Sequence, residues 1–173
     1  NQLAGGDFTL RILKGSNLEI FGQIVGEDES NLLPTKTIYN LGLSYKLNFL
    51  ENNNKIILEH TDTDVNSTYQ GVRIHNIAYN HGIYKDGYRY YKKPIGASID
   101  ADSSKSTLTY FQELNDSSLF KFKVFKSSIN ENLNQKNYWG NSIKEINGYE
   151  ITLHTSFGER ASVFLEYLEL KEE

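Results

Sequence analysis

Within residues 37–50 the side chains alternate between apolar and polar for about a dozen residues. One face of this segment carries Tyr39, Leu41, Leu43, Tyr45, Leu47 and Phe49. Alternation with a period of two predicts a β-strand with one apolar and one wet face. Strands of soluble proteins usually run about 5–6 residues, whereas a tilted strand that crosses a bilayer needs about 9–11. The segment therefore fits either a membrane-spanning strand, apolar toward lipid, or one long strand of a soluble antiparallel sheet.

The composition of the chain permits a barrel and excludes several other classes. The hydrophobic fraction of 38% and mean hydropathy of -0.53 are too polar for a bundle of membrane helices. The absence of Cys excludes disulfides and thiolate chemistry. A net charge of -4 without a large basic patch argues against a nucleic-acid partner. Because the sequence has neither Met nor a signal peptide, we expect a processed form or an internal piece of a longer protein.

Other segments of the chain alternate in the same way and are separated by turn-forming residues. They are residues 8–12, 18–24, 55–63, 107–114, 119–125, 149–157 and 161–167. No segment has a convincing helical period. The sequence therefore predicts an all-β fold, an antiparallel meander of about eight strands that forms part of a transmembrane outer-membrane β-barrel. Residues 1–173 would be a single, incomplete barrel segment.

The links between these predicted strands alternate in length. Short turns follow the first, third, fifth and seventh strands, and long links cover residues 26–35, 64–106 and 127–146. Outer-membrane barrels have short turns on the periplasmic side and long loops outside. Both ends of the strand set would then lie outside the cell, which predicts missing strands at each end or an uncounted strand within 64–106. A soluble β-sandwich with its loops at one end is the rival fold.

Several short motifs follow one another along the chain. They are QIVGEDE at 23–29, EHTDT at 59–63, YNHGIYKDGYRY at 79–90, IG at 95–96 and DADS at 100–103. In this order they resemble the Wzi family of capsule assembly proteins, over about residues 5–110. The resemblance implies a lectin-like barrel of the Gram-negative outer membrane that helps to attach capsular or exopolysaccharide at the cell surface. Its partners would be that polysaccharide and outer-membrane lipid, and the chain would be the C-terminal part of the barrel.

The Tyr-rich segment is also suited to sugar binding on chemical grounds. Aromatic rings bury sugar faces at a low entropy cost, and charged forks bind hydroxyls or acidic sugars. The predicted polysaccharide-binding residues are Tyr84, Tyr88, Arg89, Tyr90, His81, Asp86 and Trp139. The alternative is a structural role, in which these aromatic residues pack the loop against the barrel or form an interfacial belt.

Arg89 has two possible roles. In an extended backbone its side chain points away from Tyr88 and Tyr90. It can therefore reach the sugar while the tyrosines pack, or it can hold the loop through an ion pair. We expect the second role, with an acid such as Asp86, Asp100 or Asp102 as the partner, because acids flank Arg89 on both sides.

An enzyme is the alternative from another class. Glu27, Asp28 and Asp62 could supply the two carboxylates of a glycoside hydrolase, or oxygen ligands for Ca²⁺. No spacing singles out a carboxylate pair, and the four His residues lack ligand-like spacing. We therefore predict a protein that is not an enzyme and has no catalytic residue, cofactor or metal. A general porin without glycan preference is a third possibility.

Overall fold

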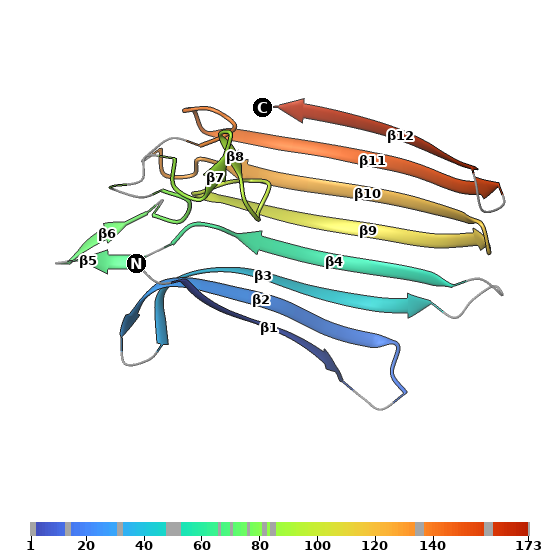
Figure 1. The fold of residues 1–173 in the computed structure, drawn as a ribbon, viewed down its shortest axis with the longest axis horizontal. Helices are drawn as coiled ribbons and strands as arrows, with labels where there is room; N and C mark the ends of the chain where they lie inside the picture. Colours follow the sequence, from blue (N-terminus) through green and yellow to red (C-terminus); the bar gives the residue numbers. More distant parts are fainter. Residues whose placement is uncertain are drawn as a thin grey trace.

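The computed structural model describes residues 3–12, 15–30, 33–47, 53–65, 67–69, 71–75, 77–80, 83, 86–133, 137–157 and 161–172. Eight long strands form one antiparallel sheet (Figure 1). They are β1 (Leu3–Arg11), β2 (Leu18–Ser30), β3 (Leu33–Leu47), β4 (Asn54–Asp62), β9 (Ser103–Asn115), β10 (Ser118–Ile129), β11 (Lys144–Phe157) and β12 (Ala161–Glu172). The strands lie side by side in chain order, with β1 and β12 at the edges. The predicted all-β antiparallel meander of eight strands is therefore confirmed.

Two small hairpins lie in the link between β4 and β9. One pairs β5 (Ser67–Tyr69) with β6 (Val72–Ile74), and the other pairs β7 (Arg89–Tyr90) with β8 (Lys93–Pro94). Both form separate two-stranded sheets, and β4 pairs directly with β9. Among the described residues, the idea of an uncounted sheet strand within 64–106 is therefore wrong. Figure 1 shows both hairpins at one end of the sheet, with β7 and β8 beside the link from β10 to β11.

The two faces of the long strands are arranged as a membrane barrel requires. In β3, Leu43 is 40% exposed whereas its neighbour Ser44 is only 2% exposed. Leu58 and Leu108 lie beside Leu43 in the register and are exposed as well. A soluble sandwich would instead cover this apolar row with a second sheet. The row is exposed across neighbouring strands in the described chain, and we call it the outward apolar belt.

The opposite face of the sheet is polar and largely buried. Lys123 lies on this inner face. Thr109 and Glu150 lie directly opposite Lys123 on the two neighbouring strands, so they share the face. The Glu150 carboxylate forms ion pairs with Lys121 and with Lys123. The buried carboxylate is thus satisfied by two ammonium groups, and it offsets only part of their positive charge.

The predicted long link at residues 26–35 is wrong. β2 continues to Ser30 and β3 begins at Leu33, and the two strands remain paired as far as Ser30 opposite Leu33. The register continues through the acidic run and places Glu27 opposite Lys36. Gly, acidic residues and Pro suggested a loop because they disrupt apolar alternation. Above a membrane both faces of a hairpin meet water, so its strands can extend without that alternation.

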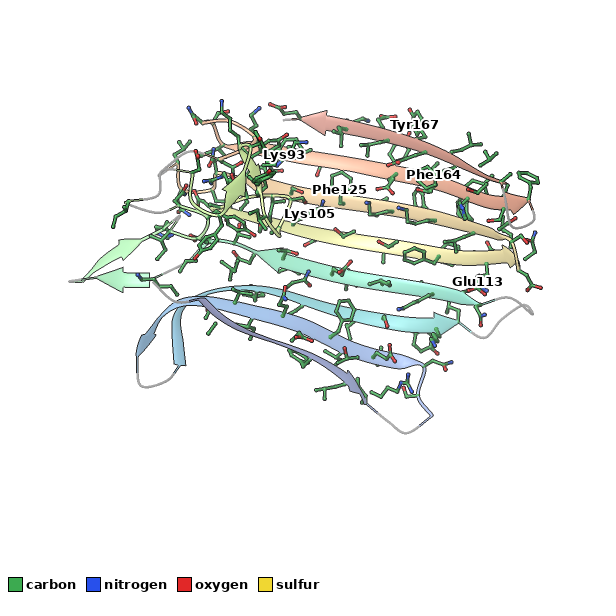
Figure 2. The ribbon with its side chains drawn as sticks, in the orientation of Figure 1. Lys93, Lys105, Glu113, Phe125, Phe164 and Tyr167 are labelled. Atoms are coloured by element: carbon green, nitrogen blue, oxygen red, sulfur yellow. The ribbon has the colours of Figure 1, made fainter. Side chains whose placement is uncertain are left out.

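The apolar core is small and sits at the loop end of the sheet. Its buried members are Ile99, Ile129 and Ile146, and Phe125 packs against them. Lys105 Nζ lies 4.6 Å from the centroid of the Phe125 ring, and Figure 2 places both residues at this end, far from Glu113. Within the described residues there is no helix able to cross a membrane. The core therefore supports the loops and leaves the outer face of the strands bare.

Candidate functional site

Arg89 forms a two-point ion pair with Asp100. Its Nε donates to Asp100 Oδ2 at 2.9 Å and its Nη2 donates to Asp100 Oδ1 at 2.8 Å. The Arg89 side chain is 9% exposed and that of Asp100 is 0% exposed. A planar guanidinium matches a carboxylate in this way, whereas an ammonium group does not. The expected loop-holding pair is present, and Asp100 is the acid in it.

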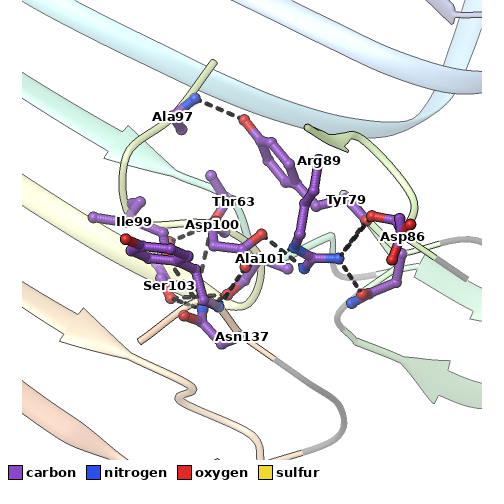
Figure 3. Close-up of polar contacts among 12 residues, drawn as sticks. Thr63, Tyr79, Asp86, Arg89, Ala97, Ile99, Asp100, Ala101, Ser103 and Asn137 are labelled. Atoms are coloured by element: carbon purple, nitrogen blue, oxygen red, sulfur yellow. Dashed lines mark hydrogen bonds and ion pairs between the residues drawn. The ribbon is translucent and has the colours of Figure 1, made fainter. Parts of the chain in front are cut away.

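The third nitrogen of Arg89 holds the beginning of the Tyr-rich segment. Nη1 donates to the carbonyl of Tyr79 at 2.9 Å, to Asn80 Oδ1 at 3.0 Å and to the carbonyl of Asp86 at 3.4 Å (Figure 3). Asp86 thus contributes its main chain, and its side chain is exposed. A single guanidinium therefore joins three separate parts of the loop.

Residues 100–103, the DADS motif, are completely buried. Asp100 and Asp102 have φ values of 63° and 53°, in the left-handed region that L residues seldom adopt. The Asp100 carboxylate also accepts a hydrogen bond from Tyr138 N at 2.6 Å. The Asp102 carboxylate accepts from Asn132 N at 3.0 Å and from Asn132 Nδ2 at 2.7 Å. These contacts stabilise the strained backbone and tie it to the β10–β11 link.

Asn137 is a structural residue that the sequence did not reveal. Its Nδ2 lies 3.1 Å from the carbonyl oxygen of Ile99, 2.7 Å from that of Ala101 and 3.2 Å from Ser103 Oγ (Figure 3). Nothing in the polar sequence around Asn137 distinguishes it from its neighbours. Its role depends on contacts made 34 to 38 residues away along the chain.

Thr63 closes the same cluster from the end of β4. Its Oγ1 lies 2.5 Å from the Asp100 carbonyl oxygen and 3.0 Å from that of Ser103. Thr63 is the last residue of the EHTDT motif, which was the only signal for it. We call Thr63, Tyr79, Arg89, residues 100–103 and Asn137 the loop base.

Gly87 and Tyr79 shape the turn of the Tyr-rich segment. Gly87 has a φ of 56°, and a Cβ at this position would lie 1.8 Å from the Tyr79 carbonyl oxygen. The Tyr79 ring is buried, and its hydroxyl accepts a hydrogen bond from Ala97 N at 2.7 Å. Burial raises the pKa of the Tyr79 hydroxyl, so it stays neutral at physiological pH. The backbone thus requires glycine here, and the tyrosine fastens the turn.

Exposed aromatic residues surround the loop base. Tyr90 and Tyr91 make an edge contact with ring centroids 4.6 Å apart. Tyr138 and Trp139 make another, with centroids 5.5 Å apart. Trp139 Nε1 donates to the Ser98 carbonyl at 2.9 Å, which fixes the indole ring. Two aromatic pairs are therefore presented to solvent on a hydrogen-bonded support.

The predicted binding residues are distributed unevenly over this region. Tyr90 and Trp139 are exposed, Tyr88 is half-buried and lines a cavity, and His81 and Tyr84 lie outside the described residues. The sequence interpretation omitted Tyr91, although its ring is the partner of Tyr90.

Of the acids proposed for an enzyme, the structure describes the side chain of Asp62. Asp62 accepts hydrogen bonds from Asp64 N at 2.8 Å and from the Tyr39 hydroxyl at 3.4 Å. The side chains of Glu27 and Asp28 lie outside those described. In the described part of the chain, no group of three or more His, Asp or Glu side chains could hold a metal ion.

Comparisons with known proteins agree with this fold. The family model "Capsule assembly protein Wzi" matches residues 1–168. The chain belongs to the Wzi capsule assembly family. Among solved structures it is similar to Wzi of Escherichia coli, described as an outer-membrane protein involved in group 1 capsule assembly and as a carbohydrate-binding β-barrel.

That similarity has a TM-score of 0.85 at 22% identity and covers 99% of this chain but 38% of the Escherichia coli chain. At this identity the likeness shows the fold, which is that of a Wzi β-barrel. The chain therefore spans less than half the length of this Wzi relative. A search of curated proteins found no match.

Proposed function

We propose that this protein binds capsular or exopolysaccharide at the outer face of the bacterial outer membrane and helps to attach it, without cleaving it. Membership of the Wzi family supports this role, and so does the description of Escherichia coli Wzi as a carbohydrate-binding barrel. The outward apolar belt of the strands supports a lipid partner. In this proposal residues 1–173 are one incomplete segment of a larger barrel.

One observation carries the proposal: two exposed aromatic pairs sit on a rigid polar support at one end of the sheet. Tyr90 with Tyr91 and Tyr138 with Trp139 present large apolar surfaces, and Lys92 adds a positive charge beside the first pair. Rings that are already ordered can bury a sugar face at little further entropy cost. This is the chemistry that a polysaccharide with alternating apolar and hydroxyl surfaces requires.

The predicted contact residues take different roles in this proposal. Tyr90 and Trp139 contact the polymer directly, and Tyr88 lies between the exposed pairs and the cavity. Arg89 supports them by holding the loop base. His81, Tyr84 and Asp86 belong to the same segment and remain proposed contacts.

Retention of polymer by living cells tests the proposal. Cells that lack the protein are complemented with the full-length wild type, Tyr90→Ala, Trp139→Ala or Phe157→Ala. A buried aromatic contact typically contributes about 2 kcal/mol, so each of the first two variants should weaken retention by about thirtyfold. Phe157 is an exposed aromatic residue at the opposite end of β11 and provides the matched control.

The same cells separate the rival functions. If polymer incubated with the wild type gained new reducing ends, and the Asp62→Asn variant did not produce them, the protein would be a hydrolase and not a binding protein. A conductance that ignores added polymer, with retention unchanged in both loop variants, would favour a porin. Retention that falls only in the loop variants, without new reducing ends, is the expected result.

A further inference from the structure

A cavity of about 420 Å³ lies between the sheet and the loop that covers its end. Its volume falls within the range of small-molecule sites, about 300–1,000 Å³. The sheet contributes inner-face residues of β2, β3 and β4. Register places Gln23, Asn40 and Thr61 in one row, and Val25 opposite Ile38 in the next row toward the loop.

The loop side of the cavity is mostly apolar. It is formed by Val65, Ile77, Ala78, Tyr79, Tyr88, Ile95 and Ala97. Among the described lining residues one cation, Lys36, is balanced by one carboxylate, Asp62. The lining therefore has no net charge that would select an acidic sugar. A sugar rich in hydroxyls would also leave some of them unpaired against the apolar wall.

Asn40 stands out among the polar lining residues. Its Oδ1 is buried and has no hydrogen-bond partner among the described residues. An unpaired buried acceptor costs about 1–3 kcal/mol, so a ligand that brings a donor, an amide N–H or a hydroxyl, would recover this energy. The terminal torsion of Asn is broad, which lets the amide turn toward the cavity.

The cavity reaches the surface near the aromatic residues. Ile95 lines it and is itself 61% exposed, and we place its opening at this residue. Tyr88 lines it as well, and its carbonyl accepts a hydrogen bond from Ile95 N at 3.0 Å. Tyr90 follows two residues later on the exposed side of the loop. A polymer lying on Tyr90 could therefore place one sugar unit into this opening.

We propose that the cavity binds an N-acetylated hexosamine unit of the polymer. The acetamido N–H would donate to Asn40, and the acetyl methyl group would pack against Val25 and Ile38. An acetamido group combines a donor for the unpaired oxygen with a methyl group for the apolar walls, whereas a sugar hydroxyl supplies the donor alone. This inference rests on the proposed polysaccharide-binding function and specifies one sugar class for it.

The direct test uses the full-length protein in detergent micelles and saturation-transfer NMR. The probes are N-acetylglucosamine, N-acetylgalactosamine and N-acetylmannosamine, each beside the corresponding hexose without the acetamido group. We expect at least one N-acetyl sugar to bind about tenfold more tightly than its hexose, because the acetamido group adds one methyl-sized contact and one hydrogen bond. Its acetyl methyl protons should receive the strongest saturation. Equal binding within all three pairs, or no binding of any N-acetyl sugar, would overturn the inference.

Two substitutions locate the site. Ile38→Trp should fill the cavity and abolish the acetyl preference, and Ile38→Ala should reduce saturation of the acetyl methyl group with little risk to folding. Ile24→Trp is the matched control, because Ile24 belongs to the outward apolar face and pairs with Tyr39. An acetyl preference that survives both Ile38 variants would place the sugar elsewhere and overturn the inference.

Polymer retention by cells distinguishes failure of the N-acetyl sugar site from failure of the proposed polysaccharide-binding function. Wild-type cells that retain polymer but show no acetyl preference would leave the proposed function standing without this site. Wild-type cells that retain no more polymer than cells lacking the protein would remove the proposed function itself.

Discussion

The long strands and the loop base bury polar groups in opposite ways. In the strands the apolar side chains face outward and polar ones such as Ser44 are buried. In the loop base, polar side chains from distant segments converge on the DADS motif, beside a small cluster of Ile99, Ile129 and Ile146. The strands thus depend on what surrounds them, whereas the loop base depends on its own hydrogen bonds.

This difference teaches which perturbations each region should resist. In the proposed role lipid surrounds the outer face of the strands, so charge placed there should be costly while small polar changes inside should be tolerated. The loop base lies in water and gains nothing from lipid. Its order should instead fail when a single buried partner is removed, because the remaining partner stays desolvated.

The largest expected effect is on the Arg89–Asp100 pair. Arg89→Met leaves the Asp100 carboxylate buried and without its guanidinium, which should cost about 3–5 kcal/mol of local stability. Limited proteolysis of residues 79–100 in the full-length barrel measures this, with heat-modifiability showing that the strands remain folded. Arg89→Lys should give an intermediate loss, because a lysine lacks the planar fork.

The double variant Arg89→Met/Asp100→Asn provides the matched control, because Asn tolerates the left-handed φ of residue 100 and its side-chain oxygen can still accept from Tyr138 N. Replacing both partners removes the unpaired charge, so protection should partly return. Polymer retention is expected to follow loop protection in all three variants. Retention that falls in Arg89→Lys while the loop stays fully protected would mean that Arg89 contacts the sugar directly.

The next largest effect is expected on the lipid face of the sheet. Leu43→Arg should cost about 2–4 kcal/mol if this row lies near the middle of the bilayer. Thr107→Arg is the control, because Thr107 lies on the inner face opposite Glu59 in the register. The measurement is the midpoint of urea unfolding in lipid vesicles. Equal midpoints for both variants would contradict the assignment of the two faces.

Gly87 offers a smaller and purely local test of the loop base. Gly87→Ala should cost more than the roughly 1–2 kcal/mol of a left-handed alanine, because its Cβ would also contact the Tyr79 carbonyl oxygen. Gly71→Ala isolates the conformational part, since Gly71 lies in the same link between β4 and β9, has a φ of 78°, and a methyl group added there would meet no atom within 4 Å beyond its chain neighbours. Proteolysis of the loop should be faster in Gly87→Ala alone. The same rate in both variants would mean that the turn at Gly87 adjusts freely.

The sequence predicted the strands well because alternation is a local signal. Each strand carries its own pattern, and the face of Leu43 follows from that pattern alone. The prediction from the sequence failed at residues 26–35, because strands that meet water on both faces need no apolar alternation. Arg89 could be paired with nearby acids by charge density, but Asn137 could not be recognised, because its contacts are fixed only when two distant loops meet. The cavity could not be predicted from the sequence either, because its walls also come from segments that are distant along the chain.

The smallest effect is expected at an ion pair on the opposite end of the sheet. Arg11 Nε donates to Glu19 Oε1 at 2.8 Å, nearly the same distance as in the Arg89–Asp100 pair, but the Arg11 side chain is 65% exposed. Exposed pairs of this kind contribute about 0–1 kcal/mol, because water screens the charges and the side chains lose entropy. Arg11→Met should therefore shift the urea midpoint in vesicles very little, and added salt should remove even that shift. A loss of stability as large as that of Arg89→Met would show that burial does not separate the two ion pairs. The contrast between strands and loop base would then have to rest on their hydrogen bonds alone.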